Sequence, residues 1–89
     1  MTHAVIVYTA NHCPYCVFAK QLLEKKGIPY DEIAIDKDDA LREIMVEKSG
    51  RQTVPQIFIN GQSIGGYDDL YALDRKGELD TLTTRKEHE

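Results

Sequence analysis

The chain lacks several features that define whole classes of protein. It has 89 residues, with no tryptophan, 2 cysteines and 3 prolines. Two cysteines separated by two residues do not staple a secreted mini-protein, because so short a bridge hardly constrains the unfolded chain. The apolar run at residues 4–8 is far too short for a signal peptide or a membrane span. We therefore expect a cytoplasmic protein with no membrane partner.

Positive charge is scarce as well. The sequence has 11 lysines and arginines against 15 aspartates and glutamates, a formal net charge of −4, and no basic stripe beyond Arg85 and Lys86. A nucleic-acid binder needs such side chains for phosphate contacts, so we expect no nucleic-acid partner. The 42% hydrophobic and 29% charged content is that of a globular chain. We expect a single domain over residues 1–89, with residues 85–89 as a frayed tail.

Hydrophobic spacing in the first half of the chain predicts strands alternating with helices. The β-branched and aromatic run at residues 5–9 predicts a strand buried on both faces. Residues 15–26 carry apolar side chains at helical spacing, and Pro14 suits the first turn of that helix. A second strand is expected at residues 30–35 and a second helix at residues 36–49. The first half therefore predicts two βα units.

The second half predicts a hairpin followed by helices. Residues 56–59 and 62–64 flank Asn60-Gly61, a dipeptide that suits the positive φ angles of a two-residue turn. A helix with acidic residues at its start is expected at residues 67–73, and a short helix at residues 78–84. The order βαβαββα indicates an α/β fold with a mixed sheet.

The two cysteines lie in the segment Cys13-Pro14-Tyr15-Cys16, between the first predicted strand and the first predicted helix. At a helix start, unpaired backbone N–H groups and the helix dipole stabilise a thiolate, so Cys13 is predicted to be the nucleophile. Cys16 follows one turn later on the same side of the helix. It is therefore expected to resolve a disulfide formed by Cys13.

A zinc site is the main structural alternative for this pair. The chain has no second CxxC motif, and His3, His12 and His88 do not form a His-x3–5-His pair, so the usual ligand pattern is incomplete. The arrangement favours redox chemistry and predicts no metal site. His12 either helps to hold the Cys13 thiolate or is an exposed loop residue without a chemical role.

Four motifs lie in order along the chain. They are Cys13-Pro14-Tyr15-Cys16, Thr53-Val54-Pro55, Asn60-Gly61 and Gly65-Gly66-Tyr67-Asp68-Asp69-Leu70. Together they resemble the dithiol CPYC members of the glutaredoxin family, within the thioredoxin-fold superfamily, over about residues 3–82. Within that family the chain looks closest to the bacterial glutaredoxin 3 type. The resemblance implies a thioredoxin-like fold, with a four-stranded mixed sheet flanked by helices.

The resemblance also implies a binding site for the tripeptide glutathione. A cis Pro55 would leave the backbone of Val54 facing the sulfurs, where glutathione pairs as an added strand. The γ-glutamyl carboxylate is expected on backbone donors at the start of the later helix, and the ammonium on the Asp68 carboxylate, with Asp69 as the helix cap. The implied glutathione-binding residues are Tyr15, Thr53, Val54, Pro55, Gly66, Tyr67 and Asp68, with Arg51 and Gln52 as further candidates.

One position departs from the family pattern. The family usually carries a lysine three residues before the first cysteine, where it contacts the glycyl carboxylate of glutathione and favours the thiolate. This chain has Ala10 at that position. The candidates to supply part of the missing role are Arg51, Gln52 and, more distantly, Lys20 and Lys37. We expect glutathione to bind more weakly, or the Cys13 thiol to be less acidic, than in relatives that carry the lysine.

The residues and the resemblance together imply a glutathione-dependent thiol-disulfide oxidoreductase. Glutathione is its co-substrate, and no tightly bound cofactor is expected. Cys13 alone would reduce protein–glutathione mixed disulfides, whereas Cys13 and Cys16 together would reduce protein disulfides and end as a Cys13–Cys16 disulfide. The expected partners are glutathione, glutathionylated or disulfide-bonded proteins and, indirectly, glutathione reductase. The chain is expected to be a monomer.

Two other functions suit the same fold. A redoxin served by thioredoxin reductase would share the cysteines and the proline, but Gly65-Gly66-Tyr67-Asp68 would then have no ligand. A [2Fe–2S] carrier would hold its cluster between two subunits through Cys13 and glutathione. Family members that do this mostly lack a proline after the first cysteine, so Pro14 argues against it. Both features favour the oxidoreductase.

Overall fold

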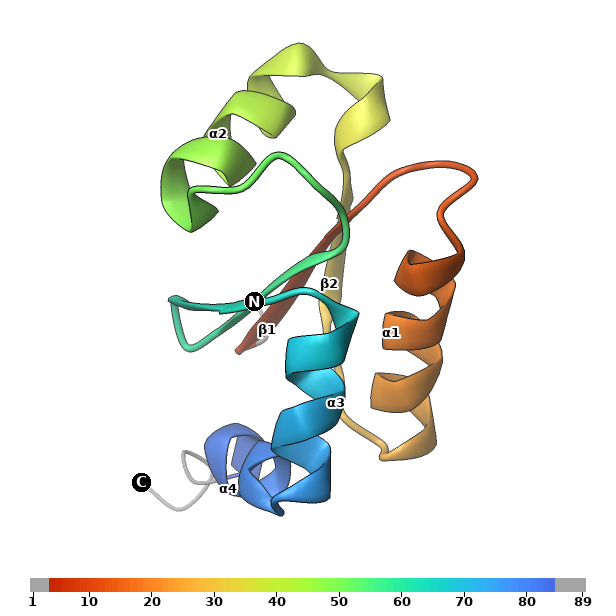
Figure 1. Ribbon diagram of the computed structural model, residues 1–89, viewed down its shortest axis with the longest axis vertical. Helices are drawn as coiled ribbons and strands as arrows, with labels where there is room; N and C mark the ends of the chain where they lie inside the picture. The colour runs from red at the N-terminus through yellow and green to blue at the C-terminus, as the bar shows by residue number, and fades with distance from the viewer. Residues whose placement is uncertain (1–3, 85–89) are drawn as a thin grey trace.

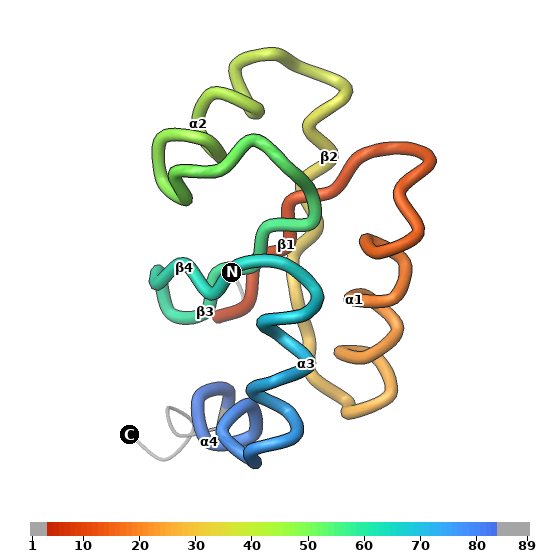
Figure 2. Tube along the Cα trace, in the orientation of Figure 1, coloured from red at the N-terminus to blue at the C-terminus, as the bar shows by residue number. Residues whose placement is uncertain are grey.

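Four strands form one mixed sheet in residues 4–84, the part of the chain described by the computed structural model. They are β1 (Val5–Thr9), β2 (Asp31–Ala34), β3 (Gln56–Ile59) and β4 (Gln62–Gly65). Their spatial order is β2-β1-β3-β4 (Figure 2). β1 pairs in parallel with β2 and antiparallel with β3, and β3 pairs antiparallel with β4. The sheet is therefore mixed, as the element order predicts.

Helices cover both faces of this sheet. α1 (Pro14–Lys25), α3 (Tyr67–Arg75) and α4 (Glu78–Thr84) lie on one face, and α2 (Asp39–Ser49) lies on the other (Figure 1). A short 3₁₀ helix, η1 (Ile35–Lys37), joins β2 to α2. This arrangement confirms the α/β fold with a four-stranded sheet flanked by helices.

The alternation of side chains along β1 separates two hydrophobic cores. Val7 is fully buried on the face covered by α1 and α3, where it packs in one cluster with Leu23. Tyr8 points to the opposite face and packs in the other cluster with Met45 and Phe58. Because successive residues of a strand point to opposite faces, one short buried strand serves both cores.

The expected start of the second helix is wrong. Asp38 has an extended backbone, with φ −160°, and its carboxylate accepts a hydrogen bond of 2.9 Å from the Ala40 N–H. This side chain therefore caps α2, which begins at Asp39 rather than at residue 36. The residues before it form η1, in which Ile35 is buried.

The turn and the last helix agree with the sequence. Asn60 and Gly61 have φ angles of 55° and 81°, as a two-residue hairpin turn requires. The final short helix is present as α4. The predicted frayed tail at residues 85–89 lies outside the described residues. Within residues 4–84, no helix combines the length and the apolar character that a membrane crossing needs.

Candidate active site

Cys13 is the N-cap residue of α1. Its backbone is extended, with φ −118° and ψ 99°, and Pro14 follows in the first turn. The Cys16 N–H donates a hydrogen bond of 3.1 Å to the Cys13 sulfur. A proline fits here because the first N–H groups of a helix have no intrahelical acceptor. The sulfur thus takes the place that a serine or aspartate oxygen usually fills, where negative charge is favoured.

The two cysteines differ in their access to solvent. Their Cα atoms are 5.2 Å apart, and their sulfurs pair as a disulfide. Cys16 is 2% exposed and faces inward, whereas Cys13 is half-buried. An incoming sulfur atom therefore has access to Cys13 and is blocked from Cys16.

A groove of about 280 Å³ lies beside Cys13, between the starts of α1, β3 and α3. The Cys13 sulfur lies 3.7 Å from the carbonyl oxygen of Val54, and the Val54–Pro55 peptide bond is cis, as the resemblance implied. Of the residues predicted to bind glutathione, eight line this groove: Tyr15, Arg51, Thr53, Val54, Pro55, Gly66, Tyr67 and Asp68. Gln52 does not line the groove and instead lies in a separate hollow with Arg42 and Glu47.

The two aspartates at the start of α3 have different surroundings. The Asp69 carboxylate accepts a hydrogen bond of 3.0 Å from the Gly66 N–H and lies 3.5 Å from the Arg51 guanidinium. Asp69 therefore caps α3, as predicted, and also holds Arg51 at the groove. Asp68 is exposed and lines the groove, so its carboxylate is available to a cationic group bound there.

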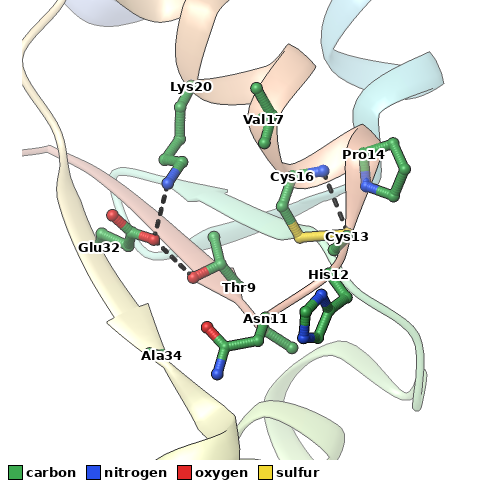
Figure 3. A pocket seen from close by; sticks show the side chains of 11 residues that line it. Thr9, Asn11, His12, Cys13, Pro14, Cys16, Val17, Lys20, Glu32 and Ala34 are labelled. Atoms are coloured by element: carbon green, nitrogen blue, oxygen red, sulfur yellow. Dashed lines mark hydrogen bonds and ion pairs between the residues drawn. A yellow bond between two sulfur atoms is a disulfide. The ribbon is translucent and has the colours of Figure 1, made fainter.

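A second hollow, of about 470 Å³, is lined by both cysteines and lies between the start of α1 and the ends of β1 and β2 (Figure 3). Lys20 and Thr9 both donate to Glu32 Oε2 there, at 3.0 Å and 2.7 Å. The Thr9 hydroxyl, followed by the Lys20 ammonium, lowers the pKa of Glu32 against the opposing effect of burial. Lys20 is therefore paired on this side of the cysteines and does not line the groove that holds Tyr15 and Tyr67.

Sequence reasoning missed the group of Thr9, Glu32 and Lys20. Thr9 and Glu32 meet because β1 and β2 pair in parallel, with Thr9 opposite Ala34. Lys20 then reaches them from α1. No short motif signals this, since the three residues come from three elements and only the sheet register brings them together.

The loop before Cys13 carries no lysine. Ala10 lines the second hollow and packs against the core of Tyr8 and Phe58. His12 is exposed and lines the same hollow, with a positive φ of 59°. Within the described part of the chain, no three His, Cys, Asp or Glu side chains gather as a metal site. The other two histidines lie outside the described residues.

Comparisons with known proteins agree with this geometry. The family model described as Glutaredoxin matches residues 5–64. The chain is 58% identical over 78 residues to Glutaredoxin 3 of Escherichia coli strain K12, covering 88% of this chain and 94% of that protein.

Two solved structures share the fold. The buckwheat glutaredoxin–glutathione complex has a TM-score of 0.86 at 32% identity, covering 92% of this chain and 77% of that one. The solution structure of glutaredoxin from Brucella melitensis has a TM-score of 0.80 at 50% identity, covering 96% and 94%. These similarities confirm the thioredoxin-like fold.

Proposed function

We propose that this chain, which belongs to the glutaredoxin family, is a glutathione-dependent thiol-disulfide oxidoreductase with Cys13 as its nucleophile and Cys16 as its resolving thiol. The observation that carries the proposal is the place of the Cys13 sulfur. Cys13 is the N-cap of α1, and its sulfur accepts the Cys16 N–H at 3.1 Å. The same sulfur lies 3.7 Å from the carbonyl oxygen of Val54, a residue that lines a groove suited to an extended tripeptide. A helix start favours the thiolate, which is the reactive form.

The first reaction uses Cys13 alone. Its thiolate attacks the glutathionyl sulfur of a protein–glutathione mixed disulfide, so a bond from Cys13 to glutathione forms and the protein leaves as a thiolate. A second glutathione thiolate then attacks the glutathionyl sulfur on Cys13. Oxidised glutathione leaves and the Cys13 thiolate is restored. Each step is an exchange of one disulfide bond for another, so electrons balance without a further cofactor.

The second reaction needs both cysteines. Cys13 attacks a protein disulfide and forms a mixed disulfide with one protein sulfur, while the other leaves as a thiolate. The Cys16 thiolate then attacks the Cys13 sulfur and releases the reduced protein. The resulting Cys13–Cys16 disulfide is reduced by two glutathione molecules. The inward position of Cys16 supports this role, since it can reach Cys13 while remaining closed to external disulfides.

Glutathione would bind in the groove by its backbone and its charges. Its cysteinyl residue would pair with Val54, whose carbonyl oxygen lies 3.7 Å from the Cys13 sulfur. The γ-glutamyl carboxylate would meet the N–H groups of Tyr67 and Asp68 at the start of α3. Its ammonium would meet the Asp68 carboxylate, and the Arg51 guanidinium held by Asp69 would take the glycyl carboxylate.

The proposed setting follows from this chemistry. The protein would act as a single-domain monomer in the reducing cytoplasm, on glutathionylated or disulfide-bonded proteins. Glutathione reductase would restore its reductant. No group beyond glutathione is needed for either reaction, because the sulfur atoms themselves carry the electrons.

Two variants separate the two reactions. Cys16→Ser is expected to keep turnover of a small glutathione mixed disulfide and to lose reduction of a protein disulfide, because only the second reaction needs a resolving thiol. Cys13→Ser is expected to lose both. The measurement is oxidation of NADPH in an assay coupled through glutathione and glutathione reductase. A parallel assay with thioredoxin reductase tests the other reductant.

Turnover by Cys13→Ser would overturn the proposal. So would activity with thioredoxin reductase and none with glutathione, because the groove would then have no glutathione to hold.

A further inference from the structure

Four aromatic side chains form a continuous cluster on the surface of α1 and α3. Tyr15 and Phe18 come from α1, and Tyr67 and Tyr71 come from α3, which packs beside α1 (Figure 1). The ring centroids of Tyr15, Phe18 and Tyr67 lie 5.8–6.2 Å apart in a triangle. Tyr71 extends the triangle, with its ring 6.0 Å from that of Tyr67. We call these four residues the aromatic row.

Three rings of the aromatic row are exposed, and the fourth, Tyr67, is partly buried against the core. Tyr15, Phe18 and Tyr71 are 57%, 45% and 42% exposed. The sequence has 5 tyrosines and 2 phenylalanines, so this one surface holds four of its seven phenyl and phenol rings. A contiguous apolar surface of this kind marks an interaction site, and aromatic residues are enriched where proteins bind one another. The stability of the fold does not explain why the rings of Tyr15, Phe18 and Tyr71 face solvent.

The aromatic row is continuous with the candidate active site. Tyr15 and Tyr67 line the groove beside Cys13, whereas Phe18 and Tyr71 do not. A partner that reacts at Cys13 and extends along α1 and α3 would therefore meet the exposed rings of Phe18 and Tyr71. Glutathione has only three residues and would be held in the groove itself. The rings beyond the groove thus suit the polypeptide that carries the reacting cysteine.

The spacing of the rings fits an extended segment. Side chains on one face of an extended chain repeat every second residue, about 6.6 Å apart. The ring centroids of Tyr15, Tyr67 and Tyr71 follow one another at 6.2 Å and 6.0 Å. Alternate apolar side chains of an extended segment would therefore stack on successive rings.

The far end of the aromatic row carries a positive charge. The Arg75 guanidinium lies over the Tyr71 ring, 5.7 Å from its centroid, and donates a hydrogen bond of 3.1 Å to the Tyr71 hydroxyl. Arg75 is exposed. An acidic side chain on the partner, placed after its apolar residues, would complement this charge.

We propose that the aromatic row is the docking surface for a protein substrate. Its occupant is an extended segment next to the reacting cysteine, with apolar side chains at alternate positions and an acidic side chain where the segment meets Arg75. This inference rests on the proposed exchange chemistry at Cys13 and adds the class of polypeptide that this chemistry prefers.

The test compares three glutathione mixed disulfides in the coupled assay. The first is a peptide in which a segment with leucine at alternate positions lies next to the cysteine and ends in a glutamate. It is made in two versions, with this segment before or after the cysteine. The second peptide has serine in place of each leucine. The third is the mixed disulfide of glutathione with 2-mercaptoethanol, which has no polypeptide. We expect kcat/KM for the leucine peptide in one of its two directions to exceed that for the serine peptide by about fivefold or more.

Phe18→Ser and Tyr71→Ser are expected to remove most of that preference. They should leave kcat/KM for the small mixed disulfide within about twofold of wild type, because neither residue lines the groove. Ile44→Ser is the matched control. Ile44 is 40% exposed, but it lies on α2 at the other face of the sheet. Arg75→Gln should remove only the preference for glutamate over glutamine at the end of the leucine peptide, measured with a version of that peptide ending in glutamine.

Equal kcat/KM for the peptides in wild type would overturn the docking surface, and so would an equal loss in Ile44→Ser. A dimer of wild type in sedimentation that Phe18→Ser abolishes would also overturn it, since a second copy would then be the occupant. Failure of the proposed function is a separate result, namely no turnover of the small mixed disulfide.

If the small mixed disulfide is not turned over, the aromatic row can still be tested by the binding of a leucine peptide that has serine in place of its cysteine. Shifts of the Phe18 and Tyr71 ring resonances on titration would support docking, and their absence would overturn it.

Discussion

At Cys13, backbone groups at the start of α1 are the main stabilisers of a negatively charged thiolate. The Cys16 N–H points at the sulfur, and the dipole of α1 ends there. The loop before it has an alanine at position 10, where the resemblance implied a lysine. Lys20, the candidate on α1, is paired with Glu32 at 3.0 Å. The helix start thus has to favour the thiolate without the usual lysine.

Ala10→Lys is therefore expected to increase the thiolate fraction of Cys13 at neutral pH and to tighten glutathione binding. A cation near a thiolate favours its charged form, and a cation near the groove favours a carboxylate. The measurements are the ultraviolet absorbance of the thiolate against pH and the KM for glutathione. Ala40→Lys adds the same charge on exposed α2 and is the control. An unchanged titration together with an unchanged KM would contradict the role given to position 10.

The hydrogen bonds of Glu32 with Thr9 and Lys20 make the stability of the fold depend on pH in the acid range. Its pKa is lowered by the Thr9 hydroxyl and then by Lys20. A carboxyl whose pKa is lower in the folded chain than in the unfolded chain stabilises the fold above its ordinary value of 4.5. That contribution is lost as the pH falls through the lower folded value.

Glu32→Gln should remove this pH dependence. We expect the variant to be less stable than wild type at neutral pH and the difference to shrink as the pH falls below 4.5. Urea unfolding at a series of pH values measures it, with Glu43→Gln on exposed α2 as the control. A difference that stays constant down to the acid limit would mean that the charge of Glu32 contributes nothing.

At the scale of elements, the start of α3 combines a helix cap with part of the proposed glutathione site. Gly65 has φ 121°, and a Cβ atom there would collide with the Asp69 carboxylate. The chain can therefore enter α3 only with glycine at this position. This entry lets the Asp69 carboxylate reach the Gly66 N–H and leaves Asp68 facing the groove.

Two neighbouring substitutions should separate the cap from the ligand site. Asp69→Ala is expected to lower the free energy of unfolding by about 1 kcal/mol, the usual effect of losing a capping hydrogen bond at a helix start. Asp68→Ala is expected to change it by less than about 0.5 kcal/mol and to raise the KM for glutathione several-fold. Urea unfolding and the coupled assay measure the two effects. The roles would be exchanged if Asp68→Ala were the destabilising variant.

At the scale of the whole molecule, α4 closes the core on the side of α1 and α3. Leu79 is fully buried in the same cluster as Leu70 and Ile57. Lys26, just after α1, pairs with Asp74 at 2.6 Å and with Asp80 at 3.1 Å. These contacts join three helices across the chain, so the short last helix contributes to the stability of the domain.

Leu79→Ala is expected to lower the free energy of unfolding by about 2–4 kcal/mol, because it leaves a cavity in a fully packed core. That is a large share of the total for a chain of this length, about 4–13 kcal/mol. Thermal and urea unfolding measure it. Thr81→Ala, at an exposed position of the same helix, should change stability by less than about 0.5 kcal/mol. Equal effects of the two substitutions would show that α4 does not complete the core.

The sequence by itself determined the features that depend on neighbouring residues. The buried strand at residues 5–9, the Asn60-Gly61 turn, the Asp69 cap and the place of Cys13 at a helix start all follow from local backbone preferences and side-chain spacing. The start of α2 was missed because residues 36–38 follow the strand without a strong break, and Asp38 acts as the cap only once its backbone is extended.

Only the tertiary structure decided which distant residues meet. The Val54 carbonyl approaches a sulfur 41 residues away because β3 pairs with β1. Glu32 reaches Thr9 through the register of β2, and Tyr67 reaches Tyr15 through the packing of α3 on α1. Such contacts depend on how sheet and helices assemble, which no short stretch of sequence encodes. The sequence thus determined the cysteine pair at a helix start, whereas the tertiary structure decided the groove and the surface around it.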